Sequence, residues 1–197
     1  MHATPLARIE AVCEEGRSHW HRFDAEVRQA SWHPFVAADY DRVRDLLLSL
    51  HAPGRRFLEW GSATGVVTIM ADLMGFDACG IELDSALVAA ARGLAARADS
   101  GARFAEGSFI PTGWVWRPGR GDARPGTIGE GPSGYLVLGR ALSDFDIVFA
   151  FPWPGEEPLM LDLFRCHGDS EARLLLHSCT GATTVHHRGR VESGPAS

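Results

Sequence analysis

Apolar and polar residues follow two different periods along this chain. Short runs rich in apolar residues, typical of strands in a buried sheet, cover residues 57–60, 78–83, 103–106, 146–151 and 173–177. Segments with apolar residues at helical spacing lie between or after them, at residues 64–74, 85–98 and 158–167. This order predicts an α/β fold: a Rossmann-like, mostly parallel sheet with helices on both faces.

Two helical patterns precede the first predicted strand. Apolar residues at helical spacing run from Leu6 to Val27, with Gly16 as a candidate break. A second stripe follows Asp39, a candidate N-cap, and ends before residues 53–54. We therefore expect residues 1–54 to form a helical segment that packs on a core made by residues 55–197.

The later part of the chain contains two irregular stretches. Residues 112–134 are dense in glycine and proline without any period, which predicts a flexible insertion. Residues 178–197 leave room for one short strand at most, so we expect a sheet truncated at its C-terminal strands. Its edge would then be covered by the N-terminal helices or by a second copy in a homodimer. The segment 186–190, rich in histidine and arginine, is expected to be a solvated tail.

Composition narrows the class of protein. A chain of 197 residues with 45% hydrophobic residues fits one globular domain. Its net charge of −6 makes a nucleic-acid partner unlikely, and no apolar run is long enough to predict a membrane span. The chain has four cysteines that form no CxxC pair, Cys13, Cys79, Cys166 and Cys179. We therefore expect reduced thiols, no metal site and a cytoplasmic location.

The most informative stretch is the loop after the first strand, EWGSATG, residues 59–65. Glycine-rich turns between a strand and a helix hold ligands at the helix N-terminus. A dinucleotide loop reads G-x-G-x-x-G, but here the spacing is one residue shorter and the carboxylate of Glu59 precedes Gly61. Negative charge would oppose a pyrophosphate and favour a cationic ligand such as S-adenosylmethionine. Gly61, Ala63 and Gly65 are small enough for a close backbone approach.

Two further stretches follow the next strands. Glu82, within GIELD, ends the second strand and can accept hydrogen bonds from both hydroxyls of a ribose, a device that NAD-binding folds share. The segment FAEGSF, residues 104–109, ends the third strand. Because ligands of open α/β sheets bind at the carboxyl ends of the strands, Ser108 and the backbone of Phe109 are expected beside an adenine.

Together these stretches resemble the class I S-adenosylmethionine-dependent methyltransferases. EWGSATG is similar to their first motif, E/D-x-G-x-G-x-G, with Ala63 at the middle glycine. GIELD is similar to the acidic motif that follows, FAEGS to the adenine-reading segment, and FDIVFAFPWP to the fourth motif beside the transferred methyl group. The resemblance covers roughly residues 33–178. It implies a methyltransferase that uses S-adenosylmethionine. The acidic net charge favours a small molecule or a protein as the substrate over nucleic acid.

The resemblance also implies roles for single residues. It assigns the ribose to Glu82 and the adenine to Leu83, Ser108 and Phe109. It assigns the methionine part of the cofactor to the first motif, at Glu59, Gly61, Ser62, Ala63 and Gly65. Two positions depart from the family pattern. Ser108 stands where an aspartate is common, and Phe151 replaces the polar first residue of N/D-P-P-Y/F/W, which argues against an amine as methyl acceptor.

Candidate catalytic residues follow the fourth strand. Trp153 lies between two prolines, so we expect its indole to wall the acceptor pocket, with Pro152 setting its angle. Glu156 is a candidate acid or base that orients the substrate. The alternative for Glu156 is the start of a helix, where carboxylates are favoured by the helix dipole. Alignment supplies most of the rate of a methyl transfer, so no catalytic triad is expected.

Two other functions remain open. A protein that binds S-adenosylmethionine without transferring its methyl group would have the same fold, and Phe151 together with the short C-terminal part fits that alternative. An NAD-linked oxidoreductase is the second. It is disfavoured by Glu59, by the loop spacing and by the lack of an evident pair of residues for hydride transfer.

Overall fold

A seven-stranded, mostly parallel sheet forms the centre of the molecule. The computed structural model describes residues 4–27, 37–114, 129 and 131–192. Five parallel strands are followed by two antiparallel ones: β1 (Arg56–Trp60), β2 (Asp77–Glu82), β3 (Arg103–Glu106), β4 (Ile147–Ala150), β5 (Arg173–His177), β6 (Thr183–His187) and β7 (Arg190–Glu192). Their order is β3-β2-β1-β4-β5-β6-β7, so the chain changes direction between β1 and β4. The predicted α/β fold is confirmed, and this switch point is where such sheets bind ligands.

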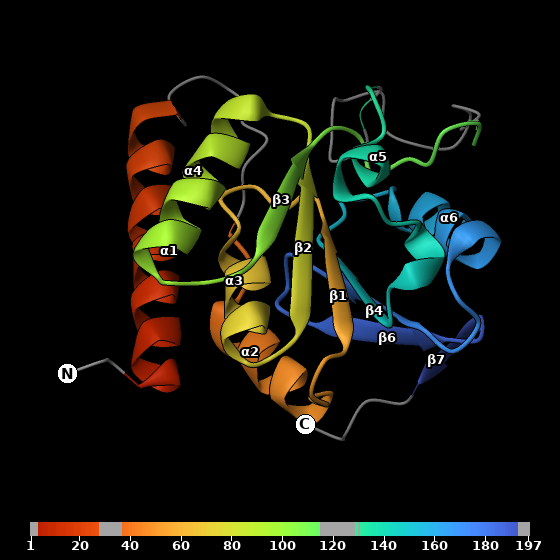
Figure 1. Ribbon diagram of the computed structural model, residues 1–197, viewed down its shortest axis with the longest axis horizontal. Helices are drawn as coiled ribbons and strands as arrows, with labels where there is room; N and C mark the ends of the chain where they lie inside the picture. Colours follow the sequence, from red (N-terminus) through yellow and green to blue (C-terminus); the bar gives the residue numbers. More distant parts are fainter. Residues whose placement is uncertain (1–3, 28–36, 115–128, 130, 193–197) are drawn as a thin grey trace.

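Helices cover both faces of the sheet (Figure 1). One face carries α1 (Pro5–Val27), α2 (Tyr40–Ser49), α3 (Val66–Leu73) and α4 (Ser85–Arg97). The other carries α5 (Gly134–Leu138), a 3-10 helix (Leu142–Asp144) and α6 (Glu157–His167). The five strands and three helices first predicted between residues 57 and 177 differ from their predicted bounds by at most two residues at either end.

Alternate residues of β1 enter two separate cores. Phe57 points to the side of α1 to α4, while Leu58 and Trp60 point to the side of α5 and α6. The first core also holds Ile9 of α1 and Val43 of α2. The two N-terminal helices therefore share one apolar core with α3 and α4; the boundary at residue 54 stays a prediction.

Gly16 does not break the first helix, contrary to the sequence prediction. The helix α1 continues from Pro5 to Val27, and Gly16 lies against Val66 and Tyr40. A Cβ atom at residue 16 would be 2.5 Å from Cγ2 of Val66. Glycine at this position permits close packing of α1 on α3, which explains why a poor helix former stands in mid-helix.

Two strands follow β5, so the prediction of one short strand at most and a solvated tail is wrong. The strands β6 and β7 are joined at Arg188 (φ 51°) and Gly189 (φ 71°), two successive left-handed residues as in a tight type I′ turn. Glu192 of β7 contacts Arg173 at 2.9 Å and His187 at 2.9 Å. Cover of the β7 edge by a second copy stays a prediction.

Some expectations concern residues that the structure does not describe. Residues 115–128 and 130 make up most of the predicted insertion. The prediction that this insertion is flexible therefore concerns residues outside the described part of the chain.

Within the described part, no helix is long and apolar enough to cross a membrane. The four cysteines are unpaired; Cys13 and Cys79 are buried, whereas Cys166 and Cys179 are exposed.

Candidate functional site

A cavity of about 710 Å³ opens at the carboxyl ends of the parallel strands. Its walls come from the segments that follow β1, β2, β3, β4 and β5, and from the start of α2. This volume suits a ligand of cofactor size. The cavity therefore lies at the switch point between β1 and β4, as expected for an open α/β sheet.

The loop after β1 is held in a left-handed path against β2. Gly61 (φ 67°), Ala63 (φ 45°) and Gly65 (φ 78°) all have positive φ. The N–H groups of Gly61 and Ser62 donate to the carbonyl of Ile81, at 2.9 and 3.0 Å. Gly61, Ser62 and Ala63 line the cavity, so the loop presents its backbone to the space where a ligand would lie.

Gly65 has a different role from its two predecessors. It does not line the cavity. A Cβ atom there would lie 2.5 Å from Cζ of Phe104 and 2.9 Å from Cβ of Ala91. Gly65 thus permits the start of α3 to pack on β3 and α4, and its predicted contact with a cofactor has no support from this geometry.

Glu59 is a buried carboxylate at the base of the cavity. Its side chain is directed toward α3, where its Oε2 accepts hydrogen bonds from the backbone N–H of Thr68 at 2.9 Å and from the Thr68 hydroxyl. Burial raises the pKa of Glu59 to about 8, although both hydrogen bonds from Thr68 lower it; the charge of Glu82 raises it further. A cation in the cavity would favour the ionised form, so the site is suited to positive charge.

Glu82 braces the loop and still faces the cavity. Its Oε2 accepts from the N–H of Ala63 at 2.8 Å, and its Oε1 accepts from the N–H of Asp84 at 3.0 Å. Each carboxylate oxygen retains a second lone pair for a ligand hydroxyl. Asp84 caps α4 by accepting hydrogen bonds from the N–H groups of Ala86 and Leu87.

Ser62 supplies a buried hydroxyl without a partner. Among the described residues, its Oγ is one of the buried polar atoms that make no hydrogen bond. Ser62 lines the cavity, and its side chain lies against Gly80 of β2. A buried hydroxyl normally has a hydrogen-bond partner, so a polar group of a ligand in the cavity could fill this role.

The segment after β3 forms the next wall. Ser108 donates its hydroxyl to the carbonyl of Gly129 at 2.8 Å, so that hydroxyl is already used within the chain. Phe109 is buried and stacks on Trp60, with ring centroids 5.0 Å apart. Leu83, which is half-exposed, lines the cavity with them. The three predicted adenine neighbours therefore share one wall.

The segment after β4 forms the opposite wall. Phe151, Pro152, Trp153 and Pro154 all line the cavity. Glu156 does not: its Oε2 accepts the N–H of Trp153 at 2.9 Å, which closes the turn just before α6. This contact and the place of Glu156 directly before α6 agree with its alternative, the start of a helix, and its role as acid or base stays a prediction. Glu157 is the neighbouring carboxylate that lines the cavity.

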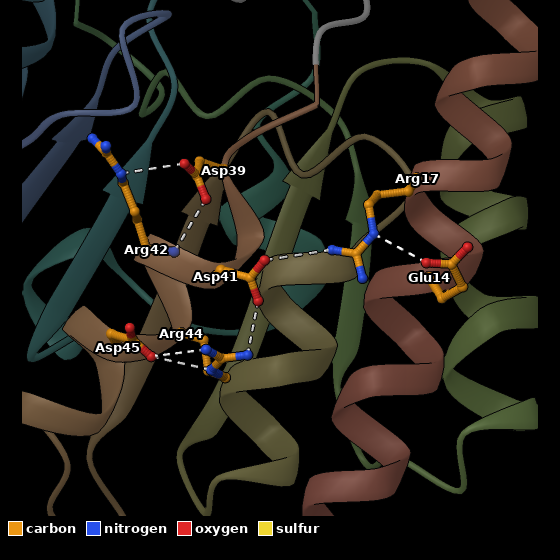
Figure 2. A network of polar contacts seen from close by, with 7 residues as sticks. All are labelled: Glu14, Arg17, Asp39, Asp41, Arg42, Arg44 and Asp45. Atoms are coloured by element: carbon orange, nitrogen blue, oxygen red, sulfur yellow. Dashed lines mark hydrogen bonds and ion pairs between the residues drawn. The ribbon is translucent and has the colours of Figure 1, made fainter.

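Sequence reasoning treated the start of α2 mainly as a helix cap and core, yet this segment also lines the cavity. Tyr40, its first residue, is buried and lines the cavity with Ala37 and Ala38. Figure 2 shows the charged network around this point: Asp39 contacts Arg42 at 3.3 Å, and Asp41 contacts Arg44 at 2.8 Å and Arg17 of α1 at 3.9 Å. These ion pairs near the surface each contribute little to stability. The start of α2 is set by Asp39, whose Oδ1 accepts the N–H of Arg42 at 3.2 Å.

Sequence reasoning missed His177, the last residue of β5. Its Nε2 accepts the backbone N–H of Asp39 at 3.2 Å, and its Nδ1 lies 2.8 Å from Oγ1 of Thr183. Its ring meets that of Phe151 edge-on, with centroids 5.0 Å apart. No local pattern could reveal this residue, because its main partner is 138 positions earlier in the chain.

The cavity differs from a metal centre. In the described part of the chain, no group of three or more histidine, cysteine or acidic residues could hold a metal ion. The carboxylates of Glu59 and Glu82 are instead engaged by backbone and hydroxyl donors.

Comparison with known proteins gives a resemblance of fold. No protein-family model and no curated protein sequence matches this chain. A solved structure of a TehB-like SAM-dependent methyltransferase from Corynebacterium glutamicum is 17% identical, with a TM-score of 0.44, over 85% of this chain and 72% of that one. A SAM-dependent methyltransferase from Thiobacillus denitrificans, solved with S-adenosyl-L-homocysteine, is 16% identical, with a TM-score of 0.45, over 78% and 52%.

A third similar structure is an RNA methyltransferase from Salinibacter ruber in complex with S-adenosyl-L-homocysteine. It is 17% identical, with a TM-score of 0.46, over 80% of this chain and 90% of that one. Similarity at this level concerns the fold alone, so the chemistry of the cavity must be argued from its own residues.

Proposed function

We propose that this chain is an S-adenosylmethionine-dependent methyltransferase. The observation that carries the proposal is the charge of the cavity. Glu59 is buried at its base, Glu82 lies beside the loop, and none of the described residues that line it is basic. Such walls suit a sulfonium and an ammonium group, whereas the pyrophosphate of a dinucleotide would find no basic side chain among the described lining residues.

The residues fit the cofactor in a definite order. Glu59 and the loop of Gly61, Ser62 and Ala63 would hold the cationic methionine part, with the free hydroxyl of Ser62 as a further donor. The spare lone pairs of Glu82 would accept the ribose hydroxyls. The adenine would lie at the wall formed by Leu83, Ser108 and Phe109.

The protein itself would contribute to the reaction by aligning the acceptor with the methyl group and by excluding water from the reacting atoms. S-adenosylmethionine supplies an electrophilic methyl group when bound. The protein would hold the acceptor between the β4 segment and the start of α2, at Phe151, Trp153 and Tyr40, in line with that methyl group. The aromatic rings exclude water from the reacting atoms. Trp153 and Pro152 thus keep their proposed roles as parts of this wall.

Binding of the cofactor is the primary test. We expect S-adenosyl-L-homocysteine to bind in calorimetry, and Glu82→Gln to weaken it by about 1.5–3 kcal/mol through loss of a charged hydrogen-bond acceptor. Glu106→Gln is a matched control, because Glu106 pairs with Glu82 across the sheet without lining the cavity. Equal losses in both variants, or no binding by the unaltered protein, would reject the proposed site.

Competition between S-adenosyl-L-homocysteine and NADH distinguishes the proposed methyltransferase from an NAD-linked oxidoreductase. The chain contains no lysine at all, so it cannot form a tyrosine–lysine pair for hydride transfer. We expect S-adenosyl-L-homocysteine to raise the melting temperature, and NADH neither to raise it nor to displace the first ligand. A larger shift with NADH would favour the oxidoreductase.

One observation favours binding without transfer as a second candidate. Phe151 stands at the strand end with a side chain that cannot accept a hydrogen bond from a substrate. Tight cofactor binding with no methylated product from any acceptor would support this alternative. For either function, we propose a cytoplasmic location, since all four cysteines are unpaired.

A further inference from the structure

We infer that the methyl acceptor is a small, uncharged molecule whose nucleophilic atom carries no hydrogen, such as a pyridine-type nitrogen, the nitrogen of a dialkylaniline or a thioether. The product would then be an onium cation. This inference rests on the proposed function and adds the substrate class. It is carried by what lines the acceptor end of the cavity and by what that end lacks among the described residues.

The acceptor end is defined by the strand order. The loop after β1 lies between two groups of strand ends, because β2 and β3 flank it on one side and β4 and β5 on the other. The β2 and β3 side holds Glu82 and Ser108, where the ribose and adenine would lie. The acceptor end, on the β4 and β5 side, is lined by Tyr40, Phe149, residues 151–154, Glu157, Ser178 and Cys179.

Charge excludes one set of acceptors. None of the described residues that line the cavity is basic, and four are acidic: Glu59, Glu82, Asp84 and Glu157. The nearby guanidinium of Arg42 is outside the lining and contacts Asp39 at 3.3 Å. A phosphate, carboxylate or thiolate would therefore be desolvated beside like charges without a counter-ion. An anionic acceptor does not fit this end.

Proton transfer excludes a second set. An acceptor with an N–H, O–H or S–H group must lose a proton, which calls for a base with a matched pKa within reach. His177 is close, but its Nε2 already accepts the N–H of Asp39. The side chain of Phe151 offers no acceptor atom, and Glu157 is an exposed carboxylate at the rim. The carboxyl group of Glu59 is held on the α3 side by the N–H and the hydroxyl of Thr68. An acceptor without such a hydrogen needs no base.

A hydrogen-free nucleophile also keeps the charge of the cavity constant. Its lone pair forms a bond to the methyl carbon while the carbon–sulfur bond breaks, and the bonding pair stays on sulfur. The sulfonium becomes a neutral thioether, the acceptor becomes an onium, and no proton moves. The faces of Phe151 and Trp153 and the carboxylate of Glu157 can stabilise the positive charge at its new position.

Binding of a product analogue tests the inference without turnover. Protein saturated with S-adenosyl-L-homocysteine is titrated with N-methylpyridinium, toluene and benzoate, which have similar size and carry positive, no and negative charge. We expect N-methylpyridinium to bind most tightly and benzoate least. Tighter binding of benzoate than of N-methylpyridinium would overturn the inference.

Two variants identify the wall responsible. Trp153→Leu removes the aromatic face but keeps apolar bulk, so N-methylpyridinium should bind roughly three- to tenfold more weakly while toluene changes much less. Glu157→Gln should weaken N-methylpyridinium by about two- to fivefold. Asp162→Asn makes the same charge change on α6 outside the cavity and should have no effect. Equal losses for charged and neutral ligands would contradict a role in holding the cation.

Turnover decides the class of acceptor. The protein is incubated with S-adenosylmethionine and with quinoline, a dialkylaniline and an alkyl aryl thioether, each paired with a phenol, a primary amine or a thiol of similar size. We expect mass spectrometry to find methylated product from the hydrogen-free member of each pair. Product only from the other members or from RNA, or no product from any, would overturn the inference. Failure to bind S-adenosyl-L-homocysteine would instead reject the proposed function itself.

Discussion

The imidazole Nε2 of His177 lies 3.2 Å from the backbone nitrogen of Asp39 and accepts its hydrogen bond. That single contact joins the end of β5 to the residue that caps α2. A ring nitrogen can accept only when it is unprotonated, so the proton is on Nδ1 and points to Thr183, 2.8 Å away. The wall of the cavity formed by Tyr40 therefore depends on a neutral histidine.

This contact predicts a loss of stability in mild acid. Burial lowers the pKa of His177 below its usual 6.5; the charge of Asp39 opposes the shift and that of Arg42 adds to it. Because the folded-state pKa is depressed, the stabilisation is present above about pH 6.5 and is lost as the pH falls through the folded-state value. The melting temperature should fall less over this window in His177→Gln, whose amide oxygen can still accept the N–H of Asp39.

The comparison needs a control, because His186 also has a pKa lowered mainly by burial. Subtracting the curve of His177→Gln from that of the unaltered protein leaves the contribution of His177. A difference that stays constant from pH 8 to pH 5 would contradict the assignment. Amide exchange of residues 39–42 should accelerate over the same range if the contact holds the start of α2.

Gly16→Ala should destabilise the protein although alanine is the better helix former. The added methyl group would lie 2.5 Å from Val66, and such overpacking costs about 1–3 kcal/mol, more than the gain in helix propensity of about 1 kcal/mol. Gly93→Ala in α4 is the matched control, since its Cβ would meet only the flexible end of Arg97, at 3.3 Å. Urea unfolding should show a loss at residue 16 and none, or a small gain, at residue 93.

Features that depend on local sequence could be predicted, and those that depend on distant partners could not. The buried parallel strands and the cavity loop were found because apolar runs and small residues are visible in the sequence itself. The β6–β7 hairpin was missed because its polar residues resemble a tail, and only pairing with β5 makes them strands. Gly16 was misread because the side chains it accommodates lie on other elements, and the packing role of Gly65 against Phe104 and Ala91 was hidden for the same reason.

Tyr135→Phe should weaken the core beneath the adenine wall. The Tyr135 oxygen accepts the indole N–H of Trp60 at 2.9 Å, and both residues are buried. Removing the hydroxyl leaves a buried donor unsatisfied, which costs about 1–3 kcal/mol. In a double-mutant cycle with Trp60→Phe, the second substitution should cost less in the presence of the first. Additive costs in urea unfolding would show that the hydrogen bond contributes nothing.

Glu59 predicts that cofactor binding releases a proton. In the free protein its pKa is raised to about 8, chiefly by burial, so below that pH much of it is protonated. Only the ionised carboxylate attracts the positively charged methionine part of the cofactor, so affinity for S-adenosylmethionine should rise with pH and level off above about 8. Calorimetry in buffers of different ionisation enthalpy should detect the released proton at pH 7.

Glu59→Gln is the decisive variant. It keeps the shape and an oxygen that can accept the N–H of Thr68, but it cannot ionise. We expect weaker binding above pH 8, no proton release and a much flatter dependence on pH. Glu106→Gln should retain the full dependence, because that carboxylate lies outside the cavity. If Glu59→Gln binds S-adenosylmethionine with the original affinity and pH profile, the buried carboxylate only supports Thr68 and the start of α3, and the cationic part of the ligand must lie elsewhere.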